Sequence, residues 1–276
     1  MTNCLICGNS LHKSVISTID FSNSGEEFNI SECSQCHFRF TSNPPAEASC
    51  GHYYKNENYI SHSNTKKGFI ARLYHIVRNI MLHRKYNLLT KLSNKTYVLD
   101  IGSGTGYFLN YLNQKGYQVQ GVEISDSARE FSIKEFKLDV KKSIDEIITK
   151  TPFDFITLWH VLEHLYDPDR YMSKFKNLLN KDGILIIALP NYDSYDGKKY
   201  EKFWAGYDVP RHLWHFTPAT FQQFAIKNGF TVISKHIMPF DPFYNALLSE
   251  KYKKNNLSIV RGFLTGLFAL IKGLRD

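Results

Sequence analysis

Two histidines and a glutamate stand within five residues near the middle of the chain. Residues 160–164, HVLEH, have the H-x-x-E-H order in which some zinc peptidases hold a metal between two histidines. Such a peptidase needs a long helix that presents both histidines, four residues apart, to one ion. Here the run follows a predicted buried strand, Phe153–Trp159, and is ended by the pair Asp167-Pro168. We therefore expect only a turn or two of helix, which argues against a peptidase.

Four of the five cysteines form two pairs with a two-residue gap. The pairs are Cys4 with Cys7 and Cys33 with Cys36. Such a gap lets both thiolates face one ion, and two pairs complete the tetrahedral shell that Zn²⁺ prefers. Because four thiolates leave no open position, a metal here would be structural, and it would stabilise residues 1–45, a ribbon too small to fold on a core alone. Free thiols are the alternative. Gly8 follows the first pair, whereas His37 stands at the equivalent position of the second.

A glycine-rich turn separates a predicted buried strand, Tyr97–Ile101, from a helix that begins near Tyr107. Its glycines are Gly102, Gly104 and Gly106. Glycines permit positive φ and let a ligand approach the amides that begin a helix. The next predicted strand, YQVQGVEI, ends at Glu123, 21 residues after Gly102, where a carboxylate can accept both ribose hydroxyl protons. The pattern indicates a nucleotide site, although its G-x-G-x-G spacing differs from the dinucleotide fingerprint.

Strands and helices alternate over the middle of the chain. A predicted helix opened by Asp167 and Pro168 lies between the strands at Phe153–Trp159 and at residues 184–190, and it ends at a tight turn, NKDG. Such alternation predicts a Rossmann-like, doubly wound α/β sheet with ligands at the carboxyl ends of its strands. The expected organisation is a ribbon, a linker with a basic amphipathic helix, a main domain and a C-terminal amphipathic helix. Their predicted ranges are 1–45, 46–95, 96–240 and 241–276.

Residues 97–236 resemble the class I S-adenosylmethionine-dependent methyltransferases in the motifs just described. The resemblance implies that Asp100 and the glycine turn hold the methionine end of S-adenosylmethionine. It also implies that Glu123 holds the ribose and that Ile124 lies against the adenine. Attack of an acceptor atom on the sulfonium methyl is an in-line displacement, which needs alignment and a base.

The histidines then acquire possible catalytic roles. The resemblance implies that Trp159 and His160 touch the sulfonium-bearing part of the cofactor. His164 can be the base that deprotonates the acceptor, since its ordinary pKa of about 6.5 suits the task. Alternatively, VLEHL resembles a metal-binding segment of quinone-pathway O-methyltransferases, so Glu163, His164 and His160 can bind Mg²⁺. In the third interpretation His164 only hydrogen-bonds a loop. His212 is a further catalytic candidate.

An aromatic insertion, residues 191–216, follows the strand that should border the acceptor cavity. Trp204, Trp214 and Arg211 suit a planar or sugar ring that carries an anionic group, although the tryptophans can instead fill a satellite core. Extended geometry places His212 opposite Arg211, so not all of these residues face a cavity. After the insertion we expect a helix capped by Thr217 and a sixth strand at residues 230–238. A seventh strand is not evident.

The ribbon, a tyrosine-rich segment at residues 52–63 and the main domain together resemble bacterial sugar methyltransferases that act on nucleotide-linked deoxysugars. In that family the tyrosine segment closes over the site, which makes Tyr54 and Tyr59 candidates, the latter for cofactor contact. The large C-terminal domain of those enzymes is missing from this sequence. We therefore expect a small-molecule acceptor (sugar, glycan, lipid or quinone-like) in cell-surface or secondary-metabolite biosynthesis.

The charge distribution is also compatible with partners other than a small molecule. The net charge is +8, and residues 58–99 and 251–275 lack acidic side chains. These runs indicate either an anionic partner or solvated helix faces. One alternative is an RNA methyltransferase that grips nucleic acid with its ribbon and basic helix. Another is a cofactor-binding regulator without turnover. The apolar C-terminal helix can dock on the domain, form a homodimer or lie on a membrane surface. The N-terminus has no secretion signal, so we expect a cytoplasmic protein.

Overall fold

The chain divides into two compact units in the computed structural model, which describes residues 3–54 and 69–274. The unit that we call the ribbon unit comprises Met1–Asn56, Leu162–Pro168 and Leu189–Asp276. The second, the sheet unit, comprises Glu57–Val161 and Asp169–Ala188. This division differs from the boundaries expected from the sequence, because the long segment after Ala188 groups with the N-terminal ribbon.

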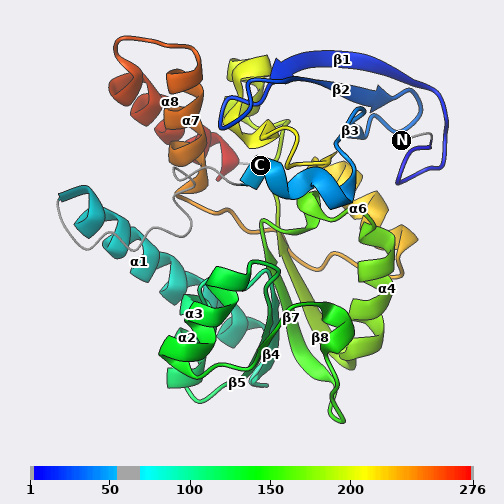
Figure 1. Ribbon diagram of the computed structural model, residues 1–276, viewed down its shortest axis with the longest axis vertical. Helices are drawn as coiled ribbons and strands as arrows, with labels where there is room; N and C mark the ends of the chain where they lie inside the picture. Colours follow the sequence, from blue (N-terminus) through cyan, green and yellow to red (C-terminus); the bar gives the residue numbers. More distant parts are fainter. Residues whose placement is uncertain (1–2, 55–68, 275–276) are drawn as a thin grey trace. The chain divides into compact units, whose positions relative to one another are not determined.

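The sheet unit is built on five parallel strands in the order β6-β5-β4-β7-β8 (Figure 1). They are β4 (Tyr97–Ile101), β5 (Gln118–Val122), β6 (Val140–Lys141), β7 (Phe153–Trp159) and β8 (Leu179–Ala188). The strand order reverses beside β4, and ligands of doubly wound sheets bind at the carboxyl ends of the strands next to such a reversal. The predicted Rossmann-like fold is confirmed.

Helices cover both faces of this sheet. They are α1 (Phe69–Leu92), α2 (Tyr107–Gln114), α3 (Asp126–Phe136) and α4 (Pro168–Leu178), with a short turn η3 (Ile144–Glu146). In Figure 1, α1, α2 and α3 lie on one side of the sheet and α4 lies on the other. Buried Leu82 and Leu89 of α1 pack with Phe108 and Leu112 of α2 and with Phe155 of β7. The apolar stripe of the basic helix therefore belongs to the core of the sheet unit.

The β8 strand starts earlier than the sequence predicted. Residues 180–183, expected as a tight turn, form an irregularity inside the strand, since β8 advances from Leu179 to Ile184 while β7 advances only from Phe153 to Phe155. The irregular segment is held against β7 by the Asn180 side-chain amide, which donates to Asp154 Oδ1 at 2.6 Å. The prediction was wrong because the turn residues loop out without ending the strand pairing.

The ribbon unit contains a four-stranded antiparallel sheet in the order β1-β2-β3-β9. Its strands are β1 (His12–Ile19), β2 (Glu27–Cys33), β3 (Arg39–Thr41) and β9 (Trp214–His215). Strand β9 comes from the aromatic insertion, which also supplies Tyr200, Trp204 and Tyr207 to a core shared with Phe28 and Ile30 of β2. The N-terminal ribbon is therefore joined to residues far along the chain, and apolar packing contributes to its stability.

Short helices complete the ribbon unit. They are η1 (Glu47–Tyr54), η4 (Leu162–His164), α5 (Tyr195–Tyr200), η5 (Glu201–Phe203), η6 (Ala205–Tyr207), α6 (Pro218–Lys227), α7 (Asp241–Tyr252) and α8 (Ser258–Gly273). Thr217 caps α6 as predicted, by accepting from the Thr220 amide. The prediction of a sixth strand at residues 230–238 was wrong. This segment pairs with no described strand, and its Ile233 is 69% exposed. Within residues 69–274, no strand follows β9.

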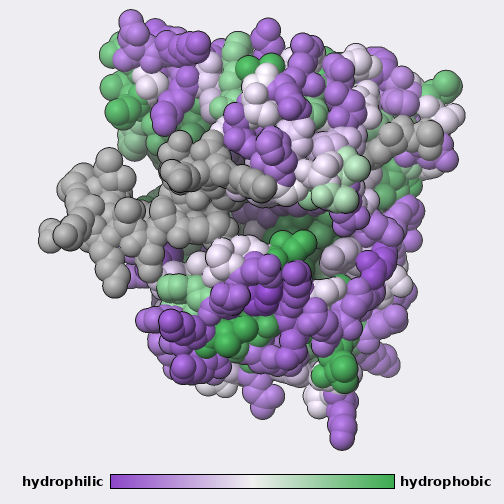
Figure 2. Space-filling model, viewed as in Figure 1, coloured by the Kyte–Doolittle hydropathy of each residue, from purple (hydrophilic) through white to green (hydrophobic). Residues whose placement is uncertain are grey.

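The C-terminal helix α8 packs on α7 and leaves apolar side chains exposed. A Cβ added to Gly262 would lie 2.9 Å from the Leu247 backbone, and one added to Gly266 would lie 2.7 Å from that of Phe243, so the two glycines permit close packing. Exposed apolar residues of α8 include Ile259, Val260, Phe263, Leu264, Phe268 and Ile271. Apolar surface shows as green at the upper left of Figure 2, where Figure 1 has α8. None of the helices in the described part of the chain is long and apolar enough to span a membrane.

Candidate functional site

The glycine turn after β4 leaves space at its centre. Gly102, Gly104 and Gly106 all have positive φ, of 69°, 56° and 79°. A Cβ added to Gly102 would lie 2.5 Å from Val161 Cγ2, and one added to Gly106 would lie 2.7 Å from Ser132 Cβ. A Cβ at Gly104 would meet no described atom within 4 Å. The outer glycines are thus required by close packing, while Gly104 faces open space that a ligand can enter.

Glu123 is fixed beside this turn. Its Oε2 accepts a hydrogen bond from the Gly104 amide at 2.7 Å, and its Oε1 accepts one from the Ser125 amide at 2.8 Å. Arg129 donates to the Glu123 carbonyl oxygen at 2.9 Å. The neighbouring Ile124 side chain is 80% exposed and offers apolar surface next to the carboxylate. The carboxylate and turn therefore adjoin, as a ribose site requires, and the cofactor-binding roles of these residues stay predictions.

Asp100, at the end of β4, is buried next to Thr157 of β7. The Thr157 hydroxyl donates to Asp100 Oδ1 at 2.5 Å. Burial raises the pKa of Asp100 to about 7, although the Thr157 hydrogen bond and the charge of Lys85 oppose that rise. Lys85 belongs to α1, and its Nζ lies 4.2 Å from the centre of the Trp159 ring. The basic run was evident in the sequence, but nothing in it singled out Lys85 as the cation beside Asp100.

Replacing Asp100 with asparagine should remove a pH-dependent loss of stability. Because the folded-state pKa of Asp100 lies above its unfolded value, its protonation stabilises the fold at low pH, and this contribution is lost as the pH rises towards 7. Between pH 5 and pH 8 the wild type should lose about 1–3 kcal/mol relative to Asp100→Asn. Urea denaturation of both cofactor-free proteins at several pH values measures this difference. A difference that does not change with pH would contradict the burial argument.

Two buried polar atoms near the carboxyl edge of the sheet make no hydrogen bond within the described residues. The Ser103 hydroxyl, in the glycine turn, and the Trp159 indole N–H, at the end of β7, have no hydrogen-bond partner among the described residues. Buried polar groups are normally paired, so the Trp159 N–H at the strand edge is suited to a polar ligand. The Ser103 hydroxyl instead lies against Gly121 of β5, because a Cβ added to Gly121 would be 2.8 Å from Ser103 Oγ. The Trp159 N–H and the space at Gly104 fit a nucleoside-type cofactor.

The HVLEH run does not form one helix. His160 directly follows β7 and has the left-handed conformation, with φ of 58°, and its backbone N–H donates to the Ala188 carbonyl at 3.1 Å. The helical turn that follows, η4, contains only Leu162–His164. His160 and His164 therefore do not share a helix face, and the geometry of a zinc peptidase is absent, as the sequence context indicated.

Within the ribbon unit, His164 lies against His212 and Glu163. The two imidazole centroids are 4.6 Å apart, and His212 Nε2 is 4.0 Å from Glu163 Oε1. Burial, with a further contribution from His212, lowers the pKa of His164 to about 4. His164 is therefore neutral at pH 7, but a group with so low a pKa is a weak proton acceptor.

Of the tyrosines predicted to close the site, Tyr54 places its hydroxyl 3.1 Å from His164 Nδ1, whereas Tyr59 lies outside the described residues.

Arg211 is not available to an anionic acceptor. Its Nη2 donates to Asp20 Oδ1 at 2.8 Å and to Asp208 Oδ1 at 2.7 Å, and its Nη1 donates to the Tyr53 carbonyl at 3.0 Å. The side chain is 1% exposed. The two carboxylates raise the pKa of Arg211 despite its burial. The sequence-based assignment was wrong because the arginine's partners include Asp20, which lies 191 positions away and could not be foreseen from local pattern.

The tryptophans of the insertion belong to the core of the ribbon unit. Trp204 is 3% exposed and donates from its indole to Asp196 Oδ2 at 2.7 Å. Trp214 is 7% exposed and donates to the Leu165 carbonyl at 2.7 Å. Both indoles are thus packed and hydrogen-bonded inside their own unit. Of the two roles considered from the sequence, filling a satellite core is confirmed for both tryptophans. The prediction that they contact an acceptor ring was wrong.

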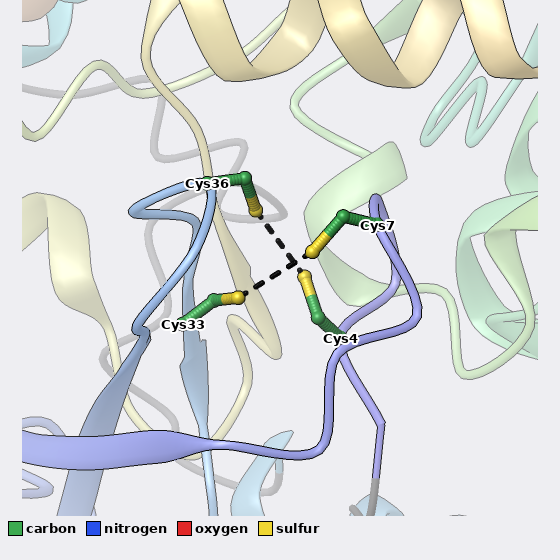
Figure 3. A group of neighbouring side chains, drawn as sticks. All are labelled: Cys4, Cys7, Cys33 and Cys36. Atoms are coloured by element: carbon green, nitrogen blue, oxygen red, sulfur yellow. Dashed lines mark hydrogen bonds between the residues drawn. The ribbon is translucent and has the colours of Figure 1, made fainter.

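The four paired cysteines converge on one point (Figure 3). Cys4 Sγ lies 3.4 Å from Cys36 Sγ, and Cys7 Sγ lies 3.5 Å from Cys33 Sγ. All four sulfur atoms lie within 4.8 Å of one another. Around a zinc ion with Zn–S bonds of about 2.3 Å, tetrahedral sulfurs stand about 3.8 Å apart. The arrangement is therefore compatible with a tetrahedral thiolate site.

The two cysteine turns have the same backbone form although only one contains glycine. Gly8 donates its N–H to the Cys4 carbonyl with φ of 72°, and His37 donates to the Cys33 carbonyl with φ of 60°. His37→Gly should therefore stabilise the protein by up to about 1 kcal/mol, because a residue with a Cβ pays a steric penalty in this conformation. Thermal unfolding measures the change. His37→Ala is the control, because it removes the imidazole but keeps the Cβ; an equal gain in both variants would contradict the explanation.

Comparison with known proteins shows the family. Residues 73–235 match the family model described as a methyltransferase domain. The chain belongs to this methyltransferase family. It is an S-adenosylmethionine-dependent enzyme of class I, with the parallel sheet expected of that class.

Two relatives and one solved structure illustrate the similarity. A ubiquinone biosynthesis O-methyltransferase of Bradyrhizobium diazoefficiens is 26% identical over 188 residues, which is 60% of this chain and 71% of that protein. The same-named protein of Pelagibacter ubique is 31% identical over 126 residues, 44% of this chain and 52% of the relative. The crystal structure of magnesium protoporphyrin IX methyltransferase from Synechocystis with bound SAH superposes with a TM-score of 0.50 at 15% identity, covering 64% and 84% of the two chains. This last likeness concerns the fold.

Proposed function

We propose that this methyltransferase transfers the methyl group of S-adenosylmethionine to a hydroxyl oxygen of a small-molecule acceptor. The observation that carries the cofactor part is the pair of hydrogen bonds that hold Glu123 against the glycine turn, beside the open space at Gly104. The relatives named as ubiquinone biosynthesis O-methyltransferases support oxygen as the acceptor atom.

The glycine turn and the side chains around it can each contribute to holding the cofactor. When bound, the cofactor supplies an electrophilic methyl group on its sulfonium. The turn lets backbone amides approach the amino-acid end of the cofactor, and Glu123 accepts from the ribose hydroxyls while Ile124 covers the adenine. The buried Trp159 N–H can donate to a polar atom of a bound molecule. Together these contacts hold the methyl group in one orientation, which an in-line displacement requires.

Part of the basic helix takes part in packing, which weakens the RNA alternative. Two cations of the basic helix are packed against aromatic rings of the sheet unit: Arg78 lies 3.8 Å from the centre of the Tyr107 ring, and Lys85 lies over Trp159. These cations contribute to packing and are poorly placed to follow a phosphate backbone. Sugars, glycans, lipids and quinone-like rings all offer hydroxyl acceptors and remain the proposed classes.

We further propose that the cysteine cluster holds a structural Zn²⁺. Support comes from the convergence of four sulfur atoms, three of them on buried or half-buried residues. Four thiolates complete the coordination of zinc, so the ion would tie the N-terminal turn to the β2–β3 turn and take no part in methyl transfer.

Calorimetric titration with SAH, followed by transfer assays with methyl-labelled S-adenosylmethionine, tests the proposal. The acceptor panel contains dihydroxylated aromatic rings, nucleotide-linked sugars, glycolipids and ribosomal RNA. We expect cofactor binding with labelling of a hydroxyl compound and no labelling of RNA. Labelling of RNA alone would overturn the acceptor class, and absence of SAH binding would overturn the cofactor site.

A further inference from the structure

The C-terminal helix α8 buries its small residues and exposes its large apolar ones. Its buried residues are Gly262, Thr265, Gly266 and Ala269. Large apolar side chains normally lie inside a protein, because removing their surface from water is favourable. A helix at the surface ordinarily turns polar residues outward. The outward side of α8 is therefore apolar where the packing of this chain alone gives no reason for it.

The exposed apolar side chains form one continuous surface, which we call the α8 face. They recur at spacings of four, three, four and three positions along one side of the helix, at Val260, Leu264, Leu267, Ile271 and Leu274. Three further side chains, each more than half exposed, widen this surface: Ile259, Phe263 and Phe268. The 16 residues of α8 extend over about 24 Å. Contiguous exposed apolar surface of this kind marks an interaction site.

Cations accompany the α8 face. Residues 251–274 contain five basic residues and no Asp or Glu: Lys251, Lys253, Lys254, Arg261 and Lys272. The three lysines stand at the end of α7 and in the turn that leads into α8, and all three are exposed. The other two are exposed on α8 itself, eleven positions apart, which places them on the same side of the helix. The apolar face therefore has a positively charged border.

The acidic residue just before this segment does not offset that charge at the surface. Glu250 is 3% exposed, and its Oε1 accepts a hydrogen bond from the Tyr200 hydroxyl at 2.9 Å. The Asn255 side-chain amide donates to its other carboxylate oxygen. Its charge is thus held inside the ribbon unit, and the border of the α8 face stays cationic.

We propose that the α8 face docks this protein on the surface of a bilayer that contains anionic lipids. The helix lies in the plane of the surface, because α7 holds it along its other side through Gly262 and Gly266. Its apolar side chains enter the boundary between headgroups and acyl chains, and the cations of its border meet the lipid phosphates. The inference does not depend on the proposed function, because it concerns a surface outside residues 73–235, which match the methyltransferase family model.

Charge favours a bilayer over a second copy of this chain. A two-fold dimer through the α8 face would set this face against the same face of the other copy. Two surfaces with cationic borders would then meet, with no acidic residue in segment 251–274 to neutralise them. Anionic headgroups are complementary to the same cations, and each Lys or Arg near such a surface strengthens binding.

Flotation of the full chain with lipid vesicles tests the docking surface. Vesicles of phosphatidylcholine mixed with phosphatidylglycerol should bind the protein at least about 10-fold more tightly than vesicles of phosphatidylcholine alone. Leu264→Glu should weaken binding to the mixed vesicles at least about 10-fold, because it places a carboxylate in the apolar boundary. Arg261→Gln should weaken it about fivefold. Ile226→Glu is the matched control, because Ile226 is a 61% exposed apolar residue on α6 of the same unit, and it should leave binding unchanged.

Three results would overturn the docking surface. If the wild type does not bind the mixed vesicles, the surface does not exist, and this outcome does not depend on how any variant folds. Equal binding of the wild type and a Leu264→Glu protein shown by circular dichroism to be folded would place the contact elsewhere. A lipid-free dimer that Leu264→Glu converts to a monomer in sedimentation velocity would assign the α8 face to a second copy. Vesicle binding without SAH binding would refute the proposed function and leave the docking surface standing.

Discussion

Glu123→Gln should weaken binding of S-adenosylmethionine and of SAH by about 100-fold or more. The carboxylate can accept from two ribose hydroxyls, and hydrogen bonds to a charged group are worth about 1.5–3 kcal/mol each. An amide keeps one acceptor oxygen, so it can still receive one of the amides that now hold Glu123, from Gly104 or Ser125. The change therefore removes charge and an acceptor without emptying the position. Calorimetric titration with SAH gives the affinity directly.

Glu130→Gln is the matched control for this experiment. Glu130 is an exposed glutamate on α3, in the same unit, and its replacement should leave the affinity within about twofold. A second comparison, Glu123→Asp, keeps the charge but shortens the reach, and it should fall between the wild type and the glutamine variant. Equal affinity of Glu123→Gln and the wild type would remove the ribose role from this residue.

The sheet unit was predictable because its signals are local. Strands β4 and β7 are mainly apolar and largely buried, and the glycines between β4 and α2 mark the turn without reference to any other part of the chain. The position of Glu123 followed from the same reasoning, since parallel strands bring their carboxyl ends to one edge of a sheet. The burial of Asp100 agrees with its place near the end of a strand that was expected to be buried.

The ribbon unit was less predictable because distant segments build it. Two residues of β9 add a fourth strand to a sheet whose other strands end at Thr41, and no local pattern marks so short a strand. The apolar alternation at residues 230–238 looked like a strand, but a strand also needs an edge with which to pair, and alternation does not reveal one. The pairing of His164 with His212 is of the same kind, because the two rings meet through the fold and not through spacing.

Cys33→Ser should cost the protein one zinc ion per chain and several kcal/mol of stability. Cys33 is fully buried at the end of β2, and its backbone N–H donates to the Phe38 carbonyl, so the residue links the metal cluster to the ribbon sheet. Burial alone would raise the pKa of this thiol, but hydrogen bonds from the Cys36 and Gln35 amides lower it to about 7. A serine hydroxyl cannot replace the thiolate as a zinc ligand, and structural zinc contributes directly to folding free energy.

We expect the thermal midpoint of Cys33→Ser to fall by about 10 °C, which corresponds to a loss of about 3–4 kcal/mol in a chain of this size. Cys50→Ser is the control, because Cys50 is also partly buried but stands outside the cluster of four sulfurs. Its zinc content should equal that of the wild type, with little change in midpoint. Since β2 also packs against Tyr200 and Trp204, the variant should keep part of its ribbon unit. A Cys33→Ser protein with full zinc content and an unchanged midpoint would mean that the four thiols hold no structural metal.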